Sequence, residues 1–131
     1  VVISHSELEG YPVSWYSALD PKGRWEEHSI DPSYGWCQTL DAGDVDLDGD
    51  LDVLAGRFTR PQPPDVPPPH DIRVYYNPGD KSGSWTKQVV RSDGGIYFGH
   101  LADLGGDGDL DIVGPRTYWT GPIEVFENKL K

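Results

Sequence analysis

Short apolar stretches alternate with turn-forming residues along the whole chain. The stretches are rich in β-branched and aromatic side chains, which is typical of strands, and none shows the spacing of an amphipathic helix. The 16 Gly and 12 Pro also disfavour helices. We therefore predict an all-β protein. Its main strands are expected at residues 13–17, 25–30, 37–43, 51–55, 72–77, 85–90, 96–102 and 110–114.

These strands belong to an internal repeat of about sixty residues. Residues 51–53 (Leu-Asp-Val) match residues 110–112 (Leu-Asp-Ile) at a separation of 59, and Trp25 matches Trp85 at a separation of 60. Each unit would contain four short strands joined by turns. Because Trp25 and Trp85 occupy equivalent positions in the repeat, we interpret both as core residues.

The repeat predicts two complete units with a partial unit at each end. One segment departs from it, because six of the residues 60–70 are proline, which disfavours a paired strand. We interpret this segment as a stiff surface loop; the alternative is the rim of a ligand groove or a contact for a partner. The expected divisions are residues 1–12 (end of a preceding unit), 13–56 (first unit), 57–71 (proline-rich insertion), 72–115 (second unit) and 122–131 (first strand of a third unit).

Charge narrows the classes of function. The 131 residues carry 22 acids against 11 Lys and Arg, a formal net charge of −11, which disfavours nucleic acid and anionic membranes as partners. No apolar run approaches the roughly 20 residues that cross a bilayer, and the single Cys37 excludes an intramolecular disulfide. Nine of the acids lie in two loops, residues 44–52 and 103–111, where their mutual repulsion favours a bound cation.

The first loop has Asp at positions 1, 3, 5 and 9 and Gly at position 6. Calcium takes about six to eight oxygen ligands, which alternating carboxylates and the carbonyl of Asp50 at position 7 would supply. An EF-hand also needs Glu at position 12, where the two loops have Ala55 and Gly114. Because a strand is predicted after each loop, we expect a cation-binding loop between strands. An ordinary Asp-Gly hairpin turn is the less favoured alternative, since two such loops lie at matched positions.

The order of these features resembles the FG-GAP and VCBS repeats, the integrin-α-like blades of β-propellers. The resemblance rests on an aromatic strand that ends in Asn (residues 74–77), a Trp that opens the next strand, and residues 42–53, and it covers nearly the whole chain. It implies a β-propeller of four-stranded blades with calcium in the Asp-rich loops. The implied calcium ligands are Asp44, Asp46, Asp48, the carbonyl of Asp50, and Asp52 in the first loop, and Asp103, Asp107, the carbonyl of Asp109, and Asp111 in the second.

Two features depart from the family pattern. Gly105 replaces the acid at position 3 of the second loop, so we expect that loop to bind calcium less tightly than the first. Two units are also too few to close a propeller, which needs about four to eight blades. We expect either a piece of a longer protein or a homo-oligomer in which several copies close one ring.

The aromatic residues raise a second hypothesis, a carbohydrate site in which rings stack on sugar faces. Aromatic residues next to turns are the candidates for exposed ligand contacts: Tyr34, Trp36, Tyr97, Tyr118 and Trp119. The four histidines fall in no recognisable nucleophile or metal motif: His5, His28, His70 and His100. We therefore assign no catalytic residue and favour a non-enzymatic role.

Taken together, the residues and the resemblance predict a calcium-binding β-propeller module with a structural or adhesive role. An extracellular setting is expected, because millimolar calcium would saturate weak sites there. The alternative is a carbohydrate-binding or polysaccharide-lyase-associated propeller. The expected partners are further copies of the chain and a carbohydrate or protein ligand.

Overall fold

The computed structural model describes residues 1–5, 8–58, 70–80, 83–116 and 121–130. These residues form ten strands in three antiparallel sheets and no helix, so the predicted all-β class is confirmed. None of the three sheets closes on itself. The described part of the chain accordingly has no helix that could cross a membrane.

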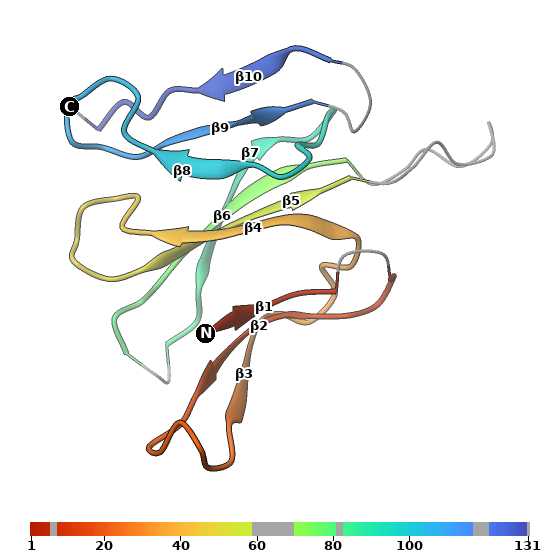
Figure 1. Ribbon diagram of the computed structural model, residues 1–131, viewed down its shortest axis with the longest axis vertical. Coiled ribbons are helices and arrows are strands. Elements are labelled where there is room, and N and C mark those ends of the chain that lie inside the picture. The colour runs from red at the N-terminus through yellow and green to blue at the C-terminus, as the bar shows by residue number, and fades with distance from the viewer. Residues whose placement is uncertain (6–7, 59–69, 81–82, 117–120, 131) are drawn as a thin grey trace.

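The sheets follow one another along the chain, with the central sheet between the other two (Figure 1). The first sheet contains β1 (Val2–Ile3), β2 (Val13–Ser17) and β3 (Glu26–Asp31). The central sheet contains β4 (Cys37–Gly43), β5 (Asp52–Arg57), β6 (Ile72–Tyr76) and β7 (Thr86–Arg91). The last sheet contains β8 (His100–Ala102), β9 (Asp111–Pro115) and β10 (Ile123–Phe126). In each sheet, strands that are neighbours in the sequence are hydrogen-bonded neighbours in space.

The predicted strands are found at or within a few residues of their expected positions, with one clear difference. A strand was expected over residues 96–102, but β8 covers only His100–Ala102. The preceding residues form a turn on the side chain of Thr39, whose hydroxyl donates to the carbonyl of Ile96 at 3.1 Å and accepts from the Gly99 N–H at 2.8 Å. Phe98 in this turn has a φ of 51°. A side chain from another strand thus holds this turn, and the Tyr97 N–H donates to the Pro115 carbonyl of β9 at 2.9 Å.

The boundaries of the hydrogen-bonded sheets differ from the boundaries of the sequence units. The four strands predicted for residues 13–56 divide between two sheets: β2 and β3 pair in the first, and β4 and β5 pair in the central sheet. The central sheet is completed by β6 and β7, because β5 pairs with β6 across the proline-rich segment. Residues 59–69 of that segment lie outside the described residues. The four-stranded sheet therefore consists of β4 to β7, two strands from each sequence unit.

The core consists of two apolar clusters, one on each face of the central sheet. The cluster against the first sheet contains Val13, Tyr34, Cys37, Val53, Ala55 and Tyr75. The cluster against the last sheet contains Val45, Leu54, Ile72, Val74, Ile96 and Ile112. Successive side chains of a strand point to opposite faces, so Val53 and Ala55 enter one cluster and Leu54 enters the other. Burial on both faces explains why β5 reads as a continuous apolar run rather than an alternating one.

A buried ionic network joins the first and central sheets. The Arg73 guanidinium donates to Asp71 at 2.6 Å and to Asp31 at 3.1 Å, and the Tyr75 hydroxyl donates to Asp31 at 2.7 Å. Although burial alone would raise the pKa of Asp31, the hydrogen bonds from Tyr75 and Ser33 and the charge of Arg73 hold it below its usual value. The network therefore keeps Asp31 ionised within the junction.

Candidate metal centre

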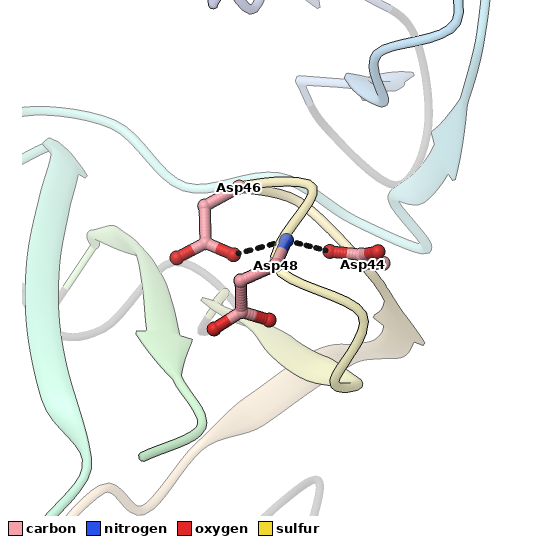
Figure 2. Close-up of side chains that lie close together, drawn as sticks. All are labelled: Asp44, Asp46 and Asp48. Carbon is pink, nitrogen blue, oxygen red and sulfur yellow. Dashed lines mark hydrogen bonds between the residues drawn. The ribbon is translucent and has the colours of Figure 1, made fainter. Parts of the chain in front are cut away.

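The first Asp-rich loop connects β4 to β5 and brings three carboxylates together. The ladder closes with Gly43 opposite Asp52, which leaves the residues between them to form the loop. Ligand oxygens of Asp44, Asp46 and Asp48 all lie within 4.8 Å of one another, and this group could hold a metal ion. Figure 2 shows the carboxylates of Asp44 and Asp46 meeting at the backbone nitrogen of Asp48, which donates to them at 3.1 and 3.3 Å. Positions 1, 3 and 5 of the sequence pattern are thus adjacent in space.

Backbone hydrogen bonds to the carboxylates wind the loop tightly. Asp44 also accepts from the Gly49 N–H at 3.1 Å, and Asp48 accepts from the Asp50 N–H at 2.9 Å. Two loop residues have a left-handed backbone: Gly49 at a φ of 100° and Leu47 at 63°. Gly49 takes this conformation readily because it has no Cβ. Leu47 adopts this conformation at a steric cost, because its Cβ crowds the backbone.

Asp52 does not belong to this group of three and holds the base of the loop. It is fully buried, at 0% exposure, and its two oxygens accept from the Val45 N–H at 2.9 Å and from the Asn77 N–H at 2.8 Å. Burial raises the pKa of its carboxyl group. Asn77 in turn donates its side-chain amide to the carbonyl of Leu51 at 3.2 Å. We call this arrangement of Asp52 and Asn77 an Asp–Asn clamp.

A second Asp–Asn clamp supports the loop between β8 and β9. Asp111 accepts from the Leu104 N–H at 3.1 Å and from the Asn128 N–H at 2.8 Å. The Asn128 amide lies within 3.4 Å of the Leu110 carbonyl and donates to Val45 of the first loop at 2.9 Å. Sequence reasoning missed the structural role of Asn77 and Asn128. The sequence did contain a pattern that could have indicated this role, because each Asn follows a similar strand with aromatic residues.

The second loop winds around Asp103 as the first winds around Asp44. Asp103 accepts from the Gly106, Asp107 and Gly108 N–H groups at 2.6, 3.2 and 3.1 Å. Among the described residues, however, only the first loop brings three acidic side chains within ligand distance of one another. Gly105 supplies no carboxylate at the position that Asp46 occupies in the first loop.

Asp50 and Asp109 occupy position 7 of the two loops, and their side chains differ in environment. The Asp50 carboxylate lies beside Gly79, where an added Cβ would come within 2.7 Å of its Oδ2 atom. Asp109 is only 1% exposed, and neither of its oxygens has a hydrogen bond of normal geometry. Burial, followed by the neighbouring Asp107 carboxylate, raises the pKa of Asp109. A cation would offset the cost of this buried charge.

The structure corrects part of the aromatic site that the sequence suggested. Tyr34 is 0% exposed, because its ring lies under the guanidinium groups of Arg57 and Arg73 at 4.0 and 4.5 Å from the ring centroid. The prediction that Tyr34 is an exposed contact is therefore wrong. The interpretation of Trp25 as a core residue is also wrong, since it is 41% exposed.

The other aromatic candidates are scattered. Trp36 is half-buried with a φ of 60°, and its N–H donates to the Leu8 carbonyl at 3.0 Å. Tyr97 is half-buried and packs against Phe58 and Phe98 at centroid distances of 5.2 and 4.3 Å. The candidates Tyr118 and Trp119 lie outside the described residues.

Two histidines that the sequence placed in strands have partners in the fold. The His28 ring stacks on Trp15 at a centroid distance of 4.0 Å, and its Nε2 atom lies 3.0 Å from the Ser17 hydroxyl. His100 is exposed, with Nδ1 at 3.4 Å from the Asp41 carboxylate. Both rings therefore have partners from neighbouring residues of the fold.

The oxygen-rich first loop has the donor chemistry of a site for a hard divalent cation. Three carboxylates at its surface supply charge and ligands that calcium prefers, and no Cys or His ligand belongs to the group. No protein-family model, no curated protein and no solved structure matches this chain.

Proposed function

We propose that this chain is a calcium-binding β-propeller module with a structural or adhesive role in an extracellular setting. The observation that carries the proposal is the meeting of the Asp44, Asp46 and Asp48 carboxylates within 4.8 Å. Calcium would complete its shell with backbone carbonyls and water. The role of Asp52 as an additional ligand, which the family resemblance implies, remains part of the proposal.

The arrangement of sheets supports assignment to the FG-GAP and VCBS repeats. The central sheet is a four-stranded antiparallel meander, as expected of a propeller blade, and sheets stack on both of its faces. Each Asp-rich loop joins two adjacent strands of one sheet, β4 to β5 or β8 to β9. The Asn128 amide links the two loops through Val45. A cation in either loop would thus stiffen the junction between neighbouring sheets.

Removal of calcium tests the structural role. We expect EDTA to lower the melting temperature by several degrees, because an ion that binds only the folded chain stabilises it by mass action. Calorimetric titration with calcium should then show a tighter site that Asp48→Ala removes and a weaker one that Asp107→Ala removes. Asp93→Ala, which deletes an exposed acid outside the loops, is the matched control. An unchanged melting temperature in EDTA rules out a structural ion, and equal losses of heat contradict the ranking of the loops.

We further propose that copies of the chain associate through stacked sheets. Apolar side chains on the outermost sheets support this, since Val1 and Ile3 of the first sheet region and Ile123 and Val125 of β10 are exposed. Covering such side chains with another sheet is favourable. Light scattering over a range of concentrations tests the proposal. A monomer at high concentration contradicts it.

Carbohydrate binding is the second candidate function. It is favoured by the exposed ring of Phe98, which packs beside Tyr97 at a centroid distance of 4.3 Å. Sugar faces stack on rings of this kind. A glycan array tests this role, with Phe98→Ala as the variant that should lose any signal. An assay for unsaturated uronate products separates a lyase from a lectin.

A further inference from the structure

A pocket of about 250 Å³ lies between the first and central sheets, beside the Asp-rich loop. Its walls come from both sheets: Trp15 of β2 on one side, and Val53 of β5 with Trp85, which precedes β7, on the other. Asp50 and Asp80 also line it. Two Trp and two Asp residues therefore line one small space.

Both Trp side chains are held in place by the fold. Trp15 stacks on His28 with an interplanar angle of 16° and is half-buried. Trp85 is half-buried and packs against the apolar cluster that contains Val53 and Tyr75. Because neither ring must be immobilised on binding, a ligand would lose little free energy to ordering the site.

The polar groups of the pocket are mainly acceptors. No Lys, Arg or His is among the described residues that line it. The α-amino group of Val1 donates to the Tyr16 carbonyl at 3.2 Å. The Asn77 amide is engaged locally, since it donates to Leu51 and accepts from the Gly79 N–H at 3.1 Å. A sugar hydroxyl both donates and accepts, so these groups would meet only part of its hydrogen-bonding capacity, whereas an organic cation needs only acceptors and aromatic faces.

The corresponding pocket at the next junction has a different character. It lies between the central and last sheets and has a volume of about 190 Å³. In the first sheet, Trp15 of β2 pairs with His28 of β3. The equivalent pair of the central sheet is Val74 of β6 with Gln88 of β7, so an aliphatic side chain takes the place of the Trp ring. The second pocket also contains Lys129, paired with Glu127 at 2.9 Å. The combination of two Trp and two acids is thus specific to the first junction.

We propose that the pocket formed by Trp15, Trp85, Asp50 and Asp80 binds an organic ammonium ion. The rings would attract the cation through their faces, and the carboxylates would neutralise it. The net charge of −11 would favour the approach of such a ligand. This inference rests on the rings and the pocket rather than on the Asp44, Asp46 and Asp48 group. Asp50 is the one implied calcium ligand that also lines the pocket, and its implied ligand atom is the backbone carbonyl oxygen.

Calorimetric titration of the full chain with choline, in millimolar calcium and at matched ionic strength, tests the proposal. The comparison ligand is 3,3-dimethylbutan-1-ol, which has the same shape without the charge. We expect choline to bind at least about tenfold more tightly. Equal binding of the two ligands, binding of methyl glucoside in preference to choline, or no binding of choline each overturns the proposal. A parallel titration with N-acetyl-trimethyllysine amide shows whether a small molecule or a modified side chain is the better source of the ammonium group.

Variants locate the binding to this pocket. Trp15→Leu and Trp85→Leu keep an apolar side chain but remove the aromatic face, and each should weaken choline binding by about tenfold. Trp25→Leu is the matched control, because Trp25 is exposed and does not line the pocket. Asp50→Asn should also weaken binding, while Glu9→Gln removes the same charge elsewhere and should not. Unaltered affinity in Trp15→Leu and Asp50→Asn, both still folded by circular dichroism, contradicts the assignment.

Discussion

The two Asp-rich loops share a hydrogen-bonded frame and differ in the groups they present. In each, the first Asp accepts from the N–H groups four and five residues later, and an Asp–Asn clamp closes the base. Only the first loop gathers three carboxylates within 4.8 Å among the residues described. The frame therefore does not depend on the acid at position 3. We infer that the frame determines the shape of the loop and that position 3 tunes its affinity for a cation.

The largest effect is expected from breaking the shared frame. Asp52→Ala and Asp111→Ala should each lower the free energy of unfolding by about 3 kcal/mol, because each leaves two backbone N–H groups without their acceptor at a buried position. Urea unfolding in EDTA measures this loss without a contribution from calcium.

Asp46→Ala is the control for the clamp variants, since Asp46 is exposed and outside the clamp. It should change the free energy of unfolding in EDTA by less than about 1 kcal/mol. Similar losses from Asp52→Ala and Asp111→Ala would support a common frame. A negligible loss from either would show that its clamp does not hold the loop.

Exchanging the residues at position 3 should bring the loops closer in affinity for calcium. Gly105→Asp should tighten the second site by about tenfold, and Asp46→Gly should weaken the first by a similar factor, because affinity rises with the number of charged ligands. A Cβ at Gly105 would meet the Asp107 carboxylate at 3.4 Å, which is an ordinary contact. Calcium calorimetry on both variants measures the change. If Gly105→Asp bound no better than the parent chain, position 3 would not explain the difference.

The smallest effect on stability is expected at position 4 of the loops, where the backbone is left-handed and the two loops have different residues. Leu47 has a φ of 63°, whereas the matching position of the second loop holds Gly106 at 72°. Gly106→Leu should destabilise the fold by about 1 kcal/mol through backbone strain, since space around an added Cβ is open. Leu47→Gly should change stability by less than about 1 kcal/mol, because relief of strain is opposed by the greater freedom of the unfolded chain. Thermal unfolding in EDTA tests both, and a gain in stability from Gly106→Leu would contradict the argument.

The local part of the structure was predictable because it depends on neighbours in the sequence. The two-residue period of strands and the Pro, Gly and Asp turns located the strands, with 96–102 as the clear exception. In that segment the backbone conformation depends on hydrogen bonds to Thr39, a residue nearly sixty positions earlier in the chain. The alternating acids of residues 44–48 likewise predicted a shared cation site, since a tightly wound loop brings such positions together.

Burial and hydrogen-bond roles depended on residues far along the chain. Tyr34 sits next to a turn in the sequence, yet Arg57 and Arg73 cover its ring. Asp52 looked like a further acid of the loop, yet it is buried and holds two backbone N–H groups, one of them from Asn77. Neither role could be read from the sequence, because the partners come from other strands.

By itself, the sequence determined the all-β class, the positions of most strands and the gathering of Asp44, Asp46 and Asp48, which are consequences of local periodicity and turn chemistry. Only the tertiary structure decided that β5 pairs with β6, and so that the four-stranded central sheet runs from the first sequence unit into the second. It also decided that Trp15 and Trp85 face one pocket with Asp50 and Asp80. The physical reason is that strand pairing and sheet stacking bring together residues that are far apart along the chain. Nothing in the sequence around each residue indicates which distant residue it will contact.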